Sequence, residues 1–323
     1  MTVSVILPIF KVEPFIERCV RSLMVQTFED VEFIFVDDAS PDKSISIAKR
    51  VVSEYSKNVR FITHPVNKGL PAARNTGLAV ATGEFLYHCD SDDWLESNFL
   101  EKMVKAARDN DADFVYCDFY LSFAVKERYM SQPHYTDKFE ALQKGVLTGN
   151  MKHNVWNKLI KRELYTRNNI KSPEEHCKGG EDYMIVKLLR MADKVAHVPE
   201  ALYHYNRTNV NAITKKNSER HFEDVKANAD DIIDFLTEHP IPESIFINYF
   251  KLDVKLPFLM DRSYEQCRRW KAWYPESNEY IMTNSYQSFR TRIVELMAKW
   301  GFYSLVYLYG WAVEKLYYGI YKI

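Results

Sequence analysis

The sequence predicts an α/β fold built on a mostly parallel, doubly wound sheet and followed by a helical C-terminal extension. Three observations predict this fold. From residue 3 to 118, short β-rich runs alternate with helical patterns, which is the order of strand–helix–strand units. Two of these runs end in acidic residues, at the sheet edge where parallel sheets bind ligands. Beyond residue 219 the alternation stops, and the chain becomes helical and aromatic.

The predicted strands are short runs rich in β-branched and aromatic residues, and they lie at 3–10, 31–38, 59–64, 84–90 and 113–119. The first helix follows Pro14 and carries apolar residues at helical spacing. The second helix is predicted to have Ser40 as its N-cap and Pro41 at its first position.

The strand pattern loosens between residues 121 and 149 and resumes at 152–165. A glycine pair, Gly179-Gly180, then precedes a helical run from Glu181 to Met191. The change in composition near residue 220 predicts two parts, a domain at 1–220 and a helical region at 221–323.

Composition excludes several classes of function. The 323 residues include 43 Lys and Arg against 44 Asp and Glu, so the chain lacks the basic footprint of a nucleic-acid-binding protein. The five cysteines are widely spaced, which predicts neither a zinc ribbon nor a disulfide framework and favours a reducing, cytoplasmic compartment. The opening MTVSVILPIF has no basic n-region, so we expect no signal peptide there.

The two acidic strand ends predict a site for a divalent cation and a phosphate ligand. The sequence has neither a P-loop nor a dinucleotide-binding glycine motif, so a metal ion is expected to hold the phosphate. Asp90 and Asp92 are alternate residues after the fourth strand, and both can offer oxygen to a hard cation. Asp38 follows the second strand and can accept a hydrogen bond from the N–H of a base such as uracil. Its alternative is to cap the next helix.

Three further segments carry candidate site residues. Arg74 lies one turn inside a helix that follows a glycine turn, an arrangement suited to an anion, with a surface salt bridge as the alternative. Asp182 begins the helix after the glycine pair, where it either complements the helix dipole or acts as a general base. His204 alternates with tyrosines as a strand residue would, and is either a structural group or a ligand.

Together these segments resemble glycosyltransferase family 2, whose members have the GT-A fold, over about residues 2–210. The resemblance rests on SVILPIF, VDDASPDKS, NKGLPAARNTGL, CDSDDW and GGEDY, which occur in the family's order. It implies an inverting transfer of sugar from a nucleoside diphosphate sugar, with UDP preferred, to a saccharide or lipid-linked acceptor in polysaccharide biosynthesis. Two other interpretations are a sugar-phosphate nucleotidyltransferase and a catalytically silent binding module.

The resemblance also implies roles for individual residues. Pro8, Phe10 and Glu13 would line the nucleotide pocket, and Asp38 would contact the base. The remaining implied roles are Asp182 as catalytic base, Asp90 and Asp92 at Mn²⁺ or Mg²⁺ with Asp90 also near the ribose, and Arg74, Arg207 and His204 on the phosphate or metal side. The choice between Asp92 and Asp93 for the metal stays open.

The aromatic C-terminal tail is a candidate interaction surface. Phe302, Leu305, Val306, Tyr309 and Val313 begin an apolar face that continues at helical spacing through Leu316, Tyr317 and Ile320. Such a helix either contacts the inner face of the plasma membrane or packs on the catalytic domain or a second subunit.

Overall fold

The structure is a computed structural model, and it describes residues 1–175, 180–210, 219–260 and 263–313. The chain forms two compact units. The first comprises Met1–Leu142 and Lys152–Phe235, and the second comprises Gln143–Met151 and Leu236–Ile323. The division falls inside helix α8 (Glu219–Glu238). The predicted division into two domains near residue 220 stays a prediction.

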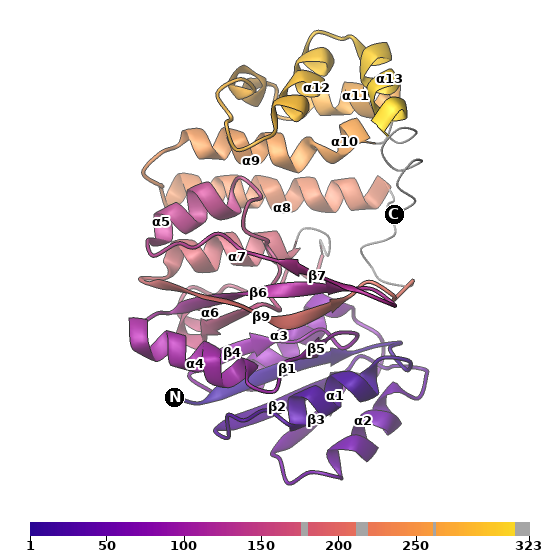
Figure 1. The fold of residues 1–323 in the computed structure, drawn as a ribbon, viewed down its shortest axis with the longest axis vertical. Helices are drawn as coiled ribbons and strands as arrows, with labels where there is room; N and C mark the ends of the chain where they lie inside the picture. Colours follow the sequence, from indigo (N-terminus) through magenta and orange to yellow (C-terminus); the bar gives the residue numbers. More distant parts are fainter. Residues whose placement is uncertain (176–179, 211–218, 261–262, 314–323) are drawn as a thin grey trace. The chain divides into compact units, whose positions relative to one another are not determined.

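The first unit is built on a nine-stranded mixed sheet (Figure 1), which confirms the predicted fold class. Its strand order is β3-β2-β1-β4-β8-β6-β9-β5, with β7 paired to β6. The strands are β1 (Val3–Ile9), β2 (Val31–Asp37), β3 (Val59–Thr63), β4 (Phe85–His88), β5 (Trp94–Leu95), β6 (Phe114–Ser122), β7 (Glu127–Met130), β8 (Lys158–Lys161) and β9 (Val195–Asn206).

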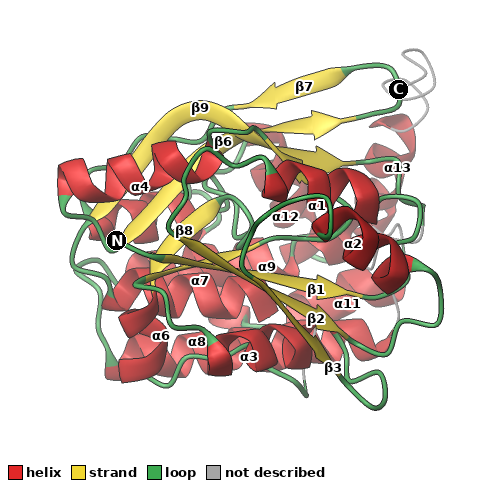
Figure 2. Ribbon diagram, turned by 90° about the horizontal axis from the view of Figure 1, so that it is seen from below, coloured by secondary structure: helices red, strands yellow, loops and turns green. Residues whose placement is uncertain are grey.

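The five predicted strands form β1, β2, β3, β4 and β6. Strands β1 to β4 pair in parallel, as do β6 and β9, whereas β8 runs antiparallel to both β4 and β6. Consequently β1, β2, β4 and β6 all end at one edge of the sheet. Figure 2 shows the arrowheads of β1 and β2 on the same side as the turn between β6 and β7.

Helices cover both faces of this sheet. Those of the first unit are α1 (Ile16–Met24), α2 (Ser44–Val52), α3 (Leu70–Val80), α4 (Phe99–Asn110), α5 (Lys138–Glu140), α6 (Arg162–Arg167), α7 (Gly180–Met191) and most of α8. Helices α1, α2 and α4 share a buried core with alternate residues of β1, including Val5 and Leu7. Helix α3 lies against the opposite face, where a Cβ at Gly77 would come within 2.4 Å of Ile6.

The start of α2 differs from the prediction. The helix begins at Ser44, not after Ser40: Lys43 is at the N-cap position, and no side chain caps the helix. The Asp42 carboxylate accepts from Ser40 Oγ at 2.7 Å and from Ser44 N at 3.1 Å. These contacts hold residues 40–43 as a turn before the helix.

The second unit is helical. It contains α9 (Ile245–Lys255), α10 (Pro257–Met260), α11 (Tyr264–Ala272), α12 (Phe289–Lys299), α13 (Tyr303–Val313), a π-helical turn (Ala141–Val146, of which Gln143 onward belongs here) and a 3₁₀ helix (Pro275–Tyr280). In the described ranges, no helix combines the length and the apolar character that crossing a bilayer requires. The predicted tail helix is confirmed to Val313, and its Leu316, Tyr317 and Ile320 lie outside the described residues.

Among the described residues of the second unit, Lys255 and Glu295 are ionisable side chains with no exposure to solvent. Lys255 Nζ donates to Trp273 O at 3.0 Å and to Asn278 Oδ1 at 2.6 Å, and burial lowers the pKa of Lys255 to about 8. Glu295 is also inaccessible to solvent, and burial raises its pKa to about 8. These groups make the stability of the helical unit dependent on pH.

We expect Glu295→Gln to change that dependence. The folded state holds a proton on Glu295 that the unfolded chain releases near pH 4.5, so its stabilising effect is present at low pH and is lost as pH rises to about 8. The free energy of unfolding of the wild-type protein should therefore fall by about 2–4 kcal/mol more than that of the variant between pH 5 and pH 8. Urea unfolding at both pH values measures this difference, and parallel pH profiles would contradict it.

Candidate active site

The candidate site lies at the edge of the sheet where β2, β1 and β4 end side by side. The backbone N–H of Asp38 donates to Ile9 O at 3.1 Å, and the N–H of Cys89 donates to Ile6 O at 3.0 Å. The acidic segments after β2 and β4 therefore flank the end of β1. The predicted convergence of two acidic strand ends at one edge is confirmed.

Asp38 holds the segment that follows β3. It is buried, and its carboxylate interacts with His64 Nδ1 at 2.7 Å. It also accepts hydrogen bonds from Asn67 Nδ2, Lys68 N and Gly69 N, each at 2.8 Å. A carboxylate has about four accepting positions, and these four protein groups occupy them. Contact with a nucleotide base would require one of these partners to be shared or displaced, so the base contact of Asp38 stays a prediction.

Arg74 and Asp90 form a buried ion pair. Helix α3 carries Arg74, whose Nη2 lies 2.9 Å from Asp90 Oδ1, and the Arg74 side chain is almost fully buried. The Asp90 side chain retains 22% of its exposure. The structure thus places a guanidinium directly beside the acidic strand end, where the sequence predicted an anion-binding group.

His88, which the sequence analysis did not identify, lies next to this pair. It is buried at the end of β4, and burial, reinforced by the positive charge of Arg74, lowers the pKa of His88 to about 3. His88 is therefore neutral near pH 7 and adds no second positive charge beside Arg74. Nothing in the local sequence distinguishes it from an ordinary strand residue.

Asp92 and Asp93 have different environments. Asp93 is inaccessible to solvent, and its carboxylate accepts hydrogen bonds from Tyr203 Oη and from Asn206 N of β9. Burial raises the pKa of Asp93, and the neighbouring carboxylates of Asp92 and Asp90 raise it further. Asp92 is partly exposed, and its Oδ2 accepts from Asn209 Nδ2 at 2.7 Å. Of the two, Asp92 is therefore the one that can reach a ligand.

His204 belongs to a structural network. Its Nε2 lies 2.9 Å from Glu96 Oε1 and its Nδ1 lies 2.8 Å from Glu127 Oε1. Its ring stacks on Trp94 at 4.8 Å, and Trp94 also carries the guanidinium of Arg18. In this arrangement neither ring nitrogen is available to a cation, because carboxylates hold both. Its role as a metal ligand stays a prediction that would require an ion pair to open.

The remaining predicted residues are distributed around the same edge. Pro8 pairs with Val36 inside the sheet, and Phe10 follows β1 and is 37% exposed. Glu13 Oε2 accepts from Lys43 N at 3.1 Å, which connects the segment after β1 to the start of α2. Glu13 therefore helps to fix the backbone at this edge through its hydrogen bond with Lys43 N.

Arg207 and Asp182 complete the predicted set. Arg207 is exposed just beyond β9, and its backbone N–H donates to Ser122 O at 2.8 Å. Asp182 lies in the first turn of α7, but its side chain lies outside the described residues, as do Cys177 and Gly179. The geometry of the predicted base is therefore not part of the site described here.

Asp90 and Asp92 fit a metal ion whose other coordination positions are filled by the substrate. Across the described ranges, no group of three or more His, Cys, Asp and Glu side chains is arranged to hold a metal ion. Asp90 and Asp92 supply oxygen, the donor atom that Mn²⁺ and Mg²⁺ prefer, from one strand end. Two carboxylates leave coordination positions for phosphate oxygens, which matches a site where the substrate supplies the other ligands.

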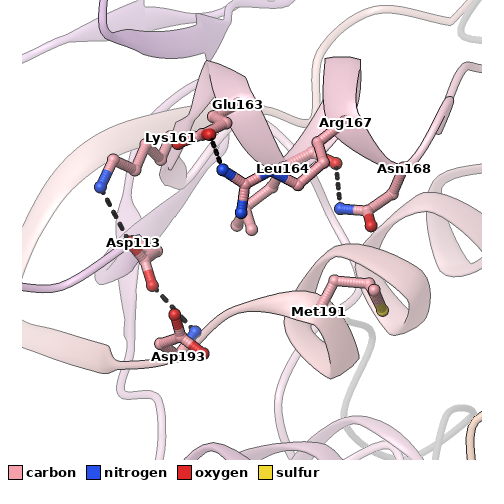
Figure 3. A pocket seen from close by; sticks show the side chains of 8 residues that line it. All are labelled: Asp113, Lys161, Glu163, Leu164, Arg167, Asn168, Met191 and Asp193. Atoms are coloured by element: carbon pink, nitrogen blue, oxygen red, sulfur yellow. Dashed lines mark hydrogen bonds and ion pairs between the residues drawn. The ribbon is translucent and has the colours of Figure 1, made fainter.

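A hollow lies at the other end of the strands (Figure 3). Asp113 precedes β6 and Lys161 ends the antiparallel β8, so the hollow is at the edge opposite to Asp90. Its charges are paired: Lys161 Nζ lies 3.3 Å from Asp113 Oδ1, and Arg167 pairs with Glu163. This hollow does not join the acidic edge and is not a candidate catalytic site.

Comparison with known proteins places the chain among glycosyltransferases. The family model described as "Glycosyl transferase family 2" matches residues 4–174. The chain is 35% identical over 224 residues to the uncharacterized glycosyltransferase EpsJ of Bacillus subtilis, covering 66% of this chain and 63% of EpsJ. The chain thus spans less than two thirds of that relative's length.

Two solved structures share the fold. S. aureus TarS 1–349 in complex with UDP-GlcNAc has a TM-score of 0.73 at 18% identity, over 95% of this chain and 89% of the TarS chain. The mannosyltransferase PcManGT of Pyrobaculum calidifontis, in complex with GDP-Man and Mn²⁺, has a TM-score of 0.56 at 17% identity, over 98% and 87% of the two chains. At these identities the likeness shows the fold alone.

Proposed function

Because this chain belongs to glycosyl transferase family 2, we propose that it transfers a sugar from a nucleoside diphosphate sugar, with UDP preferred, to an acceptor hydroxyl. The observation that carries the proposal is the ion pair of Arg74 with Asp90 just beyond β4, with the partly exposed Asp92 two residues further on. The structural neighbour TarS, which binds UDP-GlcNAc, supports the uridine preference.

Asp92 and Asp90 would hold a Mn²⁺ or Mg²⁺ ion, and the Mn²⁺ in the PcManGT structure supports this part of the proposal. When bound, the ion neutralises charge on the departing diphosphate. Arg74 orients Asp90 through their 2.9 Å ion pair and adds a fixed positive charge on the same side of the site. Asn209 holds one oxygen of Asp92, which limits the rotation of that carboxylate.

The reaction would be a single in-line displacement with inversion at the anomeric carbon. Asp182 would take the proton from the acceptor hydroxyl as the oxygen attacks, while the bond to the nucleoside diphosphate breaks. A retaining double displacement needs a carboxylate nucleophile on the other face of the sugar, and the sequence offers no separate reason for one. These assignments rest on the family resemblance, together with the place of Asp182 at the start of α7.

The acceptor is proposed to be a saccharide or a lipid-linked saccharide in polysaccharide biosynthesis. A cytoplasmic enzyme at the inner face of the plasma membrane would meet both a nucleotide sugar and a lipid-linked acceptor. Nucleic acid is not an expected partner, because the charges of the whole chain balance to a net of -1.

A panel of nucleotide sugars tests the function. We expect slow donor hydrolysis in Mn²⁺, at least about tenfold faster with one UDP-sugar than with its GDP counterpart, since one hydrogen-bonding mismatch at a base costs about 1–3 kcal/mol. Release of free sugar and nucleotide, followed by chromatography, measures it. No binding of any donor would contradict the proposal, and binding without hydrolysis or transfer would favour a silent binding module.

A further inference from the structure

The second unit has a solvent-exposed apolar surface among its described residues. Residues 301–313 contain no charged residue, and most of the large side chains in and just before α13 face solvent. We call these the α13 surface; they are 43% to 62% exposed and comprise Trp300, Phe302, Leu305, Tyr307, Leu308 and Trp311. Single exposed apolar residues are ordinary, but six within twelve consecutive residues indicate an interaction site.

The apolar character of α13 extends to its solvent-exposed side. Val306 is buried, whereas Leu305, Leu308 and Trp311 follow one another at intervals of three residues and are exposed. The predicted single face is therefore wrong in one respect: Val306 and Leu305 do not share an environment. A helix that is apolar on all sides is normally buried or in contact with lipid.

The charged side chains of the helices beside α13 are mostly basic. Tyr264 of α11 contacts α13, with its Oη 3.0 Å from Ser304 Oγ. Arg268 and Lys271 lie four and seven residues after Tyr264, on the same face of α11, and both are exposed. Together α11 and α12 carry six basic residues, Arg268, Arg269, Lys271, Arg290, Arg292 and Lys299, against Glu265 and the buried Glu295.

We propose that the α13 surface binds an anionic phospholipid bilayer. Trp and Tyr are the side chains favoured at the boundary between lipid head groups and acyl chains. Basic residues beside an apolar helix add attraction to anionic lipid. A symmetric dimer through the same surface would bring the basic residues of two copies together, and like charges at an interface are unfavourable. Charge complementarity therefore favours the membrane over a second copy.

The inference deepens the proposed function, because attachment to a bilayer would keep the enzyme where lipid-linked acceptors lie. The inference depends on the proposed function only for the biological role of membrane attachment, and the binding itself does not depend on it. Binding to vesicles is measured without donor, acceptor or turnover. Failure of vesicle binding and failure of glycosyl transfer are therefore separate results.

Flotation with vesicles tests the apolar contribution. The full chain should bind vesicles of phosphatidylcholine and phosphatidylglycerol, and Leu305→Ser/Leu308→Ser/Trp311→Ser should weaken binding by at least about 100-fold, since each buried CH₂ contributes about 0.8 kcal/mol. Val25→Ser is a matched control, because Val25 is exposed and apolar but belongs to the first unit. Circular dichroism shows whether each variant is folded.

The basic residues are tested separately. Arg268→Gln/Lys271→Gln should reduce binding to anionic vesicles by about 25-fold at low salt and leave the small binding to pure phosphatidylcholine unchanged. Equal vesicle binding by the wild-type protein and the triple serine variant would overturn the proposal. So would a stable dimer in sedimentation experiments that the same triple variant dissociates.

Discussion

Replacement of Asp182 by Asn should lower kcat by about 10²–10⁴-fold and leave the affinity for the donor nearly unchanged. The amide keeps the size of the side chain but cannot take a proton from the acceptor hydroxyl. Because a general base acts only as the transition state forms, ground-state binding of the nucleotide sugar should not change. Initial rates with saturating donor and acceptor give kcat, and calorimetry with the nucleotide sugar gives the dissociation constant.

Glu181→Gln is the matched control, because it removes a carboxylate from the neighbouring position in the same helical turn. It should retain most of the wild-type turnover. If Asp182→Asn keeps more than a third of wild-type kcat, or if Glu181→Gln loses as much activity, the base is another group. The acidic limb of the pH–rate profile should also disappear in Asp182→Asn.

Replacement of Asp92 by Asn should weaken donor binding in Mn²⁺ by about 10²-fold or more, with the fold intact. A neutral amide is a poorer ligand for a hard cation than a carboxylate. One oxygen of the partly exposed Asp92 accepts a hydrogen bond from Asn209 Nδ2, and the amide oxygen of the variant can accept the same hydrogen bond. Calorimetric titration of the nucleotide sugar, with Mn²⁺ and with EDTA, separates the metal-dependent part of the affinity.

Asp93→Asn provides the contrasting variant. Asp93 is buried and bonded to Tyr203 and Asn206 of β9, so its replacement should lower stability by about 1–3 kcal/mol. The affinity of the folded fraction should then change much less than in Asp92→Asn. Donor affinity and full activity that persist in EDTA would contradict the metal site, and a larger binding loss in Asp93→Asn would exchange the two roles.

Local patterns were sufficient for the first half of the sheet. The runs that form β1, β2, β3, β4 and β6 are apolar and β-rich, and helices separate most of them, so their parallel order follows from the connections. Parallel order alone brings the acidic ends of β2 and β4 to the same edge. The sequence therefore determined the fold class, the position of the site and the kind of residue in it.

The sequence indicated strand character at 152–165 and around His204, but it did not predict how the later strands pair, because their partners are distant in the chain. Strand β9 is long enough to show the alternation around His204, but nothing in that local pattern indicates its parallel pairing with β6, and β5 has only two residues. The start of α2 was misplaced for a similar reason. Asp42 accepts hydrogen bonds from Ser40 Oγ and from Ser44 N, and only the folded structure shows that the helix begins after this turn.

Tertiary structure alone decided which acid at the site is available. Asp92 and Asp93 are adjacent and chemically identical in the sequence, but Asp93 bonds Tyr203 and Asp92 bonds Asn209, partners more than 100 residues away. The same holds for His204, whose two nitrogens are held by Glu96 and Glu127. A side chain's role depends on its exposure and on which donors surround it, and long-range packing sets both, so a local motif can name the residues of the site but not divide the work among them.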